Sequence, residues 1–108
     1  MERRRGWTFL SNHAHVVIAL AKNTNSTVRE LADTVGITER AVTQILGDLE
    51  EAGILTRRRL GRRNVYDIDP DAHLRHDVEA HRTVGDLLRL AQPTVVKQSK
   101  PFGSAKQR

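Results

Sequence analysis

The stretch from Thr27 to Gly53 restricts the fold of this 108-residue chain more than any other part of it. Thr27 is a suitable helix N-cap, and Glu30, three residues later, completes the pattern of a capping box. Apolar residues then follow at helical spacing: Leu31, Ala32 and Val35. Gly36 comes next, and glycine tolerates the left-handed conformation that a sharp turn often needs. A first short helix that ends in a tight turn is therefore predicted.

A second helix is predicted from Thr38, its N-cap, to about Ala52, before Gly53. Its apolar residues recur at helical spacing: Val42, Ile45, Leu46 and Leu49. The other face carries short or polar groups that can reach base edges: Thr38, Glu39, Arg40, Thr43 and Gln44. Two short helices joined by a glycine-containing turn form a helix-turn-helix unit. Taken alone, the stretch also fits a plain helical hairpin.

The residues that follow, 54–69, favour the first interpretation. They predict two short strands, Ile54–Leu60 and Asn64–Asp69, with Gly61 in the connection and Pro70 after the second strand. Five arginines fall within seven residues: Arg57, Arg58, Arg59, Arg62 and Arg63. Asn64 follows directly after them. A hairpin of this kind after a recognition helix is the wing of a winged helix. Its arginines would lie along the phosphate backbone or enter the minor groove.

With these elements in order, the chain resembles the DNA-binding core of the MarR/ArsR-type winged-helix transcriptional regulators, and most of all their short members. The motifs are GITERAVTQILGDLEEAGILTRR, residues 36–58, and GRRNVYDID, residues 61–69, and the resemblance covers roughly residues 8–91. The wing is shorter than in typical MarR proteins and lacks their aspartate-containing tip. With no cysteine, the thiolate metal site of many ArsR proteins has no ligands here. The resemblance implies DNA binding and leaves the inducing signal open.

Two further helices flank this core. The first is predicted from Thr8 or Ser11 to about Lys22 and is apolar nearly all round, which indicates burial on both sides. The last is predicted from about Asp77 to Ala91. One domain of this size is not expected to bury both surfaces by itself, so we expect the two helices to form an isologous dimer interface. Its predicted residues are Val17, Ile18, Val84, Leu87, Leu88 and Ala91. The alternative is that the last helix covers the first within one subunit.

The full prediction is a mainly α fold with a small β-hairpin, a winged helix-turn-helix with a C-terminal dimerisation helix. Residues 1–7 are a basic arm, 8–91 the domain, and 92–108 a basic tail expected to be disordered. The net charge of +5 favours a polyanionic partner. No apolar run is long enough to span a membrane, no signal-peptide pattern begins the chain, and cysteine is absent, all of which fit the cytoplasm.

Catalytic and metal sites receive little support. The chain has no glycine-rich phosphate loop, no GxSxG and no nucleophile–base pair at a familiar spacing, so no enzyme activity is expected. His73, His76, Asp77 and His81 have spacings that suit zinc, but no CxxC or HExxH pattern accompanies them. These histidines are better explained as partly exposed polar residues. No metal or cofactor is predicted, and whether a small molecule is sensed stays open.

We therefore predict a homodimeric regulator, a repressor, that binds double-stranded DNA. The recognition helix would enter the major groove, with Arg40 contacting guanine and Gln44 adenine. Thr38 and Thr43 would contact phosphate or a thymine methyl group, and the wing arginines would neutralise phosphates. Two alternatives remain: a winged helix that binds a protein, and a basic nucleoid-type protein without sequence preference.

Overall fold

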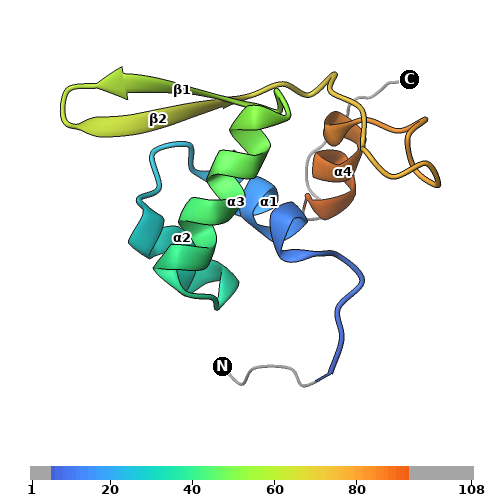
Figure 1. The fold of residues 1–108 in the computed structure, drawn as a ribbon, viewed down its shortest axis with the longest axis horizontal. Helices are drawn as coiled ribbons and strands as arrows, with labels where there is room; N and C mark the ends of the chain where they lie inside the picture. The colour runs from blue at the N-terminus through green and yellow to red at the C-terminus, as the bar shows by residue number, and fades with distance from the viewer. Residues whose placement is uncertain (1–5, 93–108) are drawn as a thin grey trace, which may run out of the picture.

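The computed structural model describes residues 6–92. The elements in chain order are α1 (Asn12–Lys22), α2 (Val28–Val35), α3 (Glu39–Glu51), β1 (Leu55–Leu60), β2 (Arg63–Ile68) and α4 (Val84–Ala91). In Figure 1, α2 and α4 lie on either side of α1, and the β1–β2 hairpin extends above α2 and α3. The predicted winged helix-turn-helix is confirmed. Most of the predicted arm, residues 1–5, and nearly all of the predicted tail, residues 93–108, lie outside the described residues.

Side-chain caps determine where the first three helices begin. The Ser11 hydroxyl accepts a hydrogen bond from the peptide nitrogen of Ala14 and caps α1. Thr27 caps α2 in the predicted capping box, in which the Glu30 carboxylate accepts in return from the Thr27 peptide nitrogen at 2.8 Å. Such caps satisfy backbone donors that would otherwise lack partners. At the other end of α2, Gly36 has a φ of 86°, the left-handed conformation that the turn requires.

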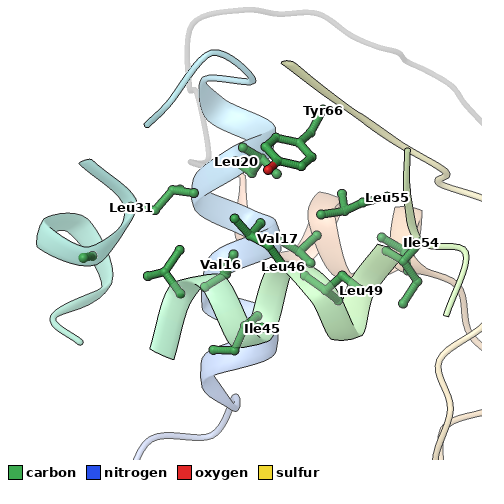
Figure 2. Packing of buried hydrophobic residues seen from close by; sticks show 13 residues of the cluster. Val16, Val17, Leu20, Leu31, Ile45, Leu46, Leu49, Ile54, Leu55 and Tyr66 are labelled. Carbon is green, nitrogen blue, oxygen red and sulfur yellow. The ribbon is translucent and has the colours of Figure 1, made fainter. Parts of the chain in front are cut away.

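A single hydrophobic core holds α1, α2, α3 and the hairpin together. Figure 2 shows side chains of α1 and α3 interleaved at its centre, with Leu31 entering from α2 and Tyr66 from β2. Along α1, residues Val16, Val17 and Leu20 are buried, Ile18 and Ala19 are half-buried, and Ala21 is exposed. The prediction that α1 is buried on both sides is therefore only partly correct. Because α3 packs into this core through its apolar face, its opposite face is held at the surface.

The two strands of the wing pair antiparallel, from Leu55 opposite Ile68 to Leu60 opposite Arg63. Only the end of β1 next to α3 is buried, at Leu55, while the rest of that strand is exposed. Gly61, with a φ of 65°, makes the turn at the far end. The hairpin is therefore anchored to the core at its base and projects into solvent at its tip (Figure 1).

The segment between the wing and α4 corrects one prediction. The last helix does not begin near Asp77, because residues 72–83 form a compact loop and α4 starts only at Val84. The loop is closed by backbone hydrogen bonds from Leu74 to Arg82 at 2.9 Å and from Val84 to Ala72 at 2.8 Å. Thr83 then caps α4, and its hydroxyl accepts from the peptide nitrogen of Asp86. A capping box close to the apolar residues thus defines the helix start.

Helix α4 is joined tightly to the root of the wing. The peptide nitrogen of Gly85 donates to the carbonyl oxygen of Pro70 at 2.8 Å. A Cβ atom at position 85 would lie 3.0 Å from that same oxygen. The peptide nitrogen of Asp69, just before Pro70, donates in turn to the carbonyl of Ile54 at 2.9 Å. The backbone of α4 therefore contacts the backbone that leaves β2, with no side chain between them.

The predicted dimer interface also needs a correction. Val17 and Val84 are only 3% and 2% exposed, because α4 packs on α1 within the same subunit. Leu88 is partly buried against the same core. Among the predicted residues, Ile18, Leu87 and Ala91 keep partial exposure, and Leu90, which was not predicted, is 75% exposed. Any partner on α4 must therefore contact its outer side.

Candidate DNA-binding surface

The outer face of α3 is open to solvent. The five residues predicted to read DNA are all exposed: Thr38, Glu39, Arg40, Thr43 and Gln44. The Thr38 hydroxyl accepts a hydrogen bond from the peptide nitrogen of Ala41 at 3.0 Å as the helix cap. Within residues 6–92, Arg40 forms no ion pair. A shallow hollow lined by Arg40, Thr43, Gln44 and Gly47 runs along this face, and the space beside Gly47 is open, since a Cβ atom at that position would meet no neighbouring group within 4 Å.

The C-terminal half of α3 is acidic. Asp48 lies 2.9 Å from the Nε2 atom of His13 on α1, and Glu50 lies 3.3 Å from Nε of Arg57 on β1. Asp48 and Glu51 line the far end of the hollow that also contains Arg40. Carboxylates repel phosphate, so a nucleic acid is favoured at the N-terminal half of α3 and disfavoured at its C-terminal half.

At the base of the wing, two of the predicted arginines are paired with carboxylates. Arg57 is held by Glu50 at 3.3 Å, and Nε of Arg58 donates to Asp67 across the hairpin at 2.6 Å. The hydrogen bond from Arg58 lowers the pKa of Asp67, and the pKa of Arg58 is raised by the same bond. Burial raises the pKa of the neighbouring Tyr66, and the charge of Glu50 raises it further. The first pair joins the base of the wing to α3, and the second joins its two strands to each other.

At the tip of the wing, the arginines meet no carboxylate among the described residues. Arg59 donates to the carbonyl of Gly61 at 3.2 Å, and Arg63 donates to the carbonyl of Asn25 at 2.6 Å. Arg62 is exposed in the turn, and Asn64 is exposed opposite Arg59. A carbonyl oxygen orients a guanidinium without cancelling its charge, so the tip stays positive.

The hydrogen bond between Arg63 and Asn25 places the tip beside the helix-turn-helix. Asn25 belongs to the loop between α1 and α2, so Arg63 joins the tip to the entrance of the helix-turn-helix. A cavity of about 200 Å³ lies between the two, lined in part by Thr27, Arg62 and Asn64. The structure thus brings the arginines of the wing tip beside the start of α2, an arrangement that the sequence did not indicate.

The remaining candidate groups fit structural roles. Nδ1 of His73 is 2.8 Å from the carbonyl of Ala80, and Nδ1 of His76 accepts from the peptide nitrogen of Val78. Both histidines therefore stabilise the loop before α4. Residues 6–92 hold no group of three or more potential metal ligands. No helix in that part of the chain is long and apolar enough to cross a membrane.

Comparison with known proteins agrees with this geometry. A family model described as the MarR family matches residues 8–63, which include α1, the helix-turn-helix and β1. No curated protein and no solved structure matched the chain. The match supports the MarR part of the predicted resemblance and gives no support to the ArsR part. Since the matched residues cover more than half of the sequence, the chain belongs to the MarR family of DNA-binding transcriptional regulators.

Proposed function

We propose that the protein is a sequence-specific repressor that binds duplex DNA as a homodimer. The observation that carries the proposal is the presence of two exposed surfaces suited to DNA. One is the outer face of α3 around Arg40, and the other is the wing tip with its arginines free of carboxylates. The first suits the edges of bases and the second suits phosphates.

In this arrangement the N-terminal half of α3 enters the major groove. Arg40 contacts guanine through two parallel hydrogen bonds, and Gln44 contacts adenine in the same way. Thr38 and Thr43 contact phosphate or a thymine methyl group, and Glu39 limits which bases fit beside them. The wing tip follows the backbone of the adjacent groove. Bound at a promoter in the cytoplasm, the protein would exclude polymerase and so repress transcription.

Homodimerisation follows from the length of DNA that one helix reads. A single recognition helix covers only a few base pairs, and two-fold pairing places a second copy about 34–36 Å away, one DNA turn. The outer side of α4, where Leu90 is 75% exposed, is the surface proposed for pairing. Sedimentation of the wild-type protein as a monomer at concentrations that saturate DNA would contradict this part.

The decisive experiment selects bound sequences from a random duplex pool and then compares the selected site with random DNA. Arg40→Ala should reduce the preference for the selected site by about 1–3 kcal/mol, the worth of one good bidentate base contact. Arg82→Ala, which removes the same charge from the exposed loop before α4, is the control and should leave the preference unchanged. Equal weakening on all sequences would assign Arg40 to phosphate binding and favour a protein without sequence preference.

A further inference from the structure

Two large aromatic side chains stand in solvent just before α1. Trp7 is 72% exposed and Phe9 is 91% exposed. Their rings contact each other edge to face, with centroids 4.9 Å apart and planes at 82°. In Figure 1 the segment that carries them runs away from the helices. Adjacent exposed aromatic rings are unusual on a folded surface and commonly mark a site of association.

An apolar groove of about 870 Å³ opens beside this segment. Its wall combines three helices, the connection between α3 and β1, and the loop before α4, through Val17, Leu49, Ile54, Leu74 and Leu87. The volume lies within the range of about 300–1,000 Å³ that is usual for binding pockets. Phe9 and Leu10 of the same subunit form part of its wall, but Phe9 is almost fully exposed, so its ring does not fill the groove.

The charges at the rim of the groove identify the kind of occupant. Asp48, Glu51 and Glu79 lie there, opposed by His13 and Arg75. Asp48 is already paired with His13, whereas Glu51 and Glu79 form no ion pair within the described residues. The sequence immediately before Gly6 is Arg3, Arg4 and Arg5. A segment of three arginines followed by Trp7 and Phe9 therefore complements a groove that is apolar inside and acidic at its edge.

We propose that two copies of the chain exchange their N-terminal segments, so that Trp7 and Phe9 of one subunit occupy the groove of the other. The arginines before Gly6 then lie against Glu51 and Glu79 of that second subunit. The exchange is isologous, because each subunit gives one segment and receives one. The exchange rests on the proposed homodimer and gives that dimer a second contact region in addition to the outer side of α4. The two regions meet at Leu87 of α4, which lines the groove.

The segment of a second copy suits the groove better than the subunit's own segment. Ser11 caps α1 and fixes the direction in which residues before it leave the helix. Phe9 is only two residues away and still remains 91% exposed. The groove also includes Leu49 and Ala52 at the end of α3, so an inserted segment would support the helix that reads DNA.

Trp7 is the only tryptophan in the chain, which gives a direct test. Its fluorescence emission should shift to the blue, and its quenching by acrylamide should fall, as the protein is concentrated from monomer to dimer. The transition should coincide with dimerisation measured by sedimentation. A dimer in which Trp7 stays fully quenchable would overturn the exchange and leave the DNA-binding function standing. A chain that neither dimerises nor binds DNA would overturn the proposed function itself.

Mixing two variants separates exchange from simple packing. Trp7→Ala/Phe9→Ala removes the inserted side chains, and Glu51→Lys/Glu79→Lys reverses the rim of the groove. Each variant alone should dimerise at least about tenfold more weakly, because buried aromatic anchors are typical interface hot spots. A one-to-one mixture should recover part of the loss, since one intact segment then meets one intact groove. Asp33→Lys, which reverses an exposed acid on α2, is the control and should not weaken dimerisation.

The mixture also decides between the competing occupants. No recovery in the mixture would mean that the segment packs in its own subunit or elsewhere, and would overturn the proposal. A change in Trp7 emission that appears only when duplex DNA is added would instead assign the segment to DNA and overturn it equally. Recovery together with a protected Trp7 in the DNA-free dimer supports the exchange.

Discussion

The base and the tip of the wing differ in what faces their arginines. At the base, Arg57 and Arg58 lie beside the carboxylates of Glu50 and Asp67. At the tip, Arg59 and Arg63 are oriented by backbone carbonyls, and Arg62 stands exposed in the turn. Exposed ion pairs add little stability, so the pairs at the base mainly set the position of the hairpin. We infer that the tip supplies most of the charge offered to phosphate.

The largest effect is expected from removing arginines at the tip. Arg62→Ala/Arg63→Ala should weaken binding to selected and random DNA alike and reduce the slope of log affinity against log salt by about 0.9 for each phosphate that is no longer neutralised. Arg57→Ala/Arg58→Ala changes the net charge equally and serves as the matched control, with a clearly smaller change in slope. If the two double variants reduce the slope equally, the distinction between base and tip fails.

A smaller effect should follow from releasing an arginine at the base. Asp67→Asn removes the counter-charge of Arg58 with little change in shape. Arg58 can then bind phosphate, so the salt slope should become steeper by up to about 0.9, the value for one additional neutralised phosphate. Asp71→Asn, an exposed acid beyond the wing, controls for the general change in charge. The same steepening in both variants would show that only net charge matters.

The smallest effect concerns acid pH. The hydrogen bond from Arg58 lowers the pKa of Asp67 in the folded state. The pair therefore adds its full stability at pH values above the unfolded-state pKa of Asp67, and this added stability is lost as the pH falls through the lower pKa of the folded state. Denaturant midpoints of the wild type should therefore exceed those of Asp67→Asn slightly and constantly from neutral to mildly acidic pH. The difference should vanish only in strong acid. Equal denaturant midpoints of the two proteins already at neutral pH would show that the pair is not formed in solution.

Features that depend on neighbours in the sequence were predictable. Thr27 and Glu30 are three residues apart, so their capping box follows directly from the sequence, as does the glycine turn at Gly36. The residues on the open face of α3 follow from helical spacing in the same way. The sequence therefore predicted the helix-turn-helix, the wing and the exposure of the candidate DNA-contacting residues.

Features that depend on folding at longer range were not predictable. His13 meets Asp48, 35 positions away, and Arg63 meets Asn25, 38 positions away. No local pattern marks such pairs, and five arginines close together in sequence look equivalent until their partners are known. The position of α4 on α1 likewise depends on the tertiary core, so helical spacing alone cannot tell that Val17 and Val84 are buried within one subunit.

The error at the start of α4 has a different cause. The acids Asp77 and Glu79 suit the first turn of a helix, but a favourable charge is a weaker signal than a capping box. Thr83 and Asp86 provide that box, and it was present in the sequence. The backbone hydrogen bonds that fold residues 72–83 into a loop then exclude an earlier start.

The close approach of Gly85 to Pro70 has a mechanical consequence. Since even a methyl group would be crowded there, the start of α4 is in direct contact with the root of the wing, and we expect the two to move together as one rigid unit. Any rolling of α4 over α1 must carry the exit of β2 with it. In the proposed homodimer paired through α4, the position of this helix would then set the distance between the two wings. A change at the contact between the subunits would alter how the wings lie on DNA without any movement of α3.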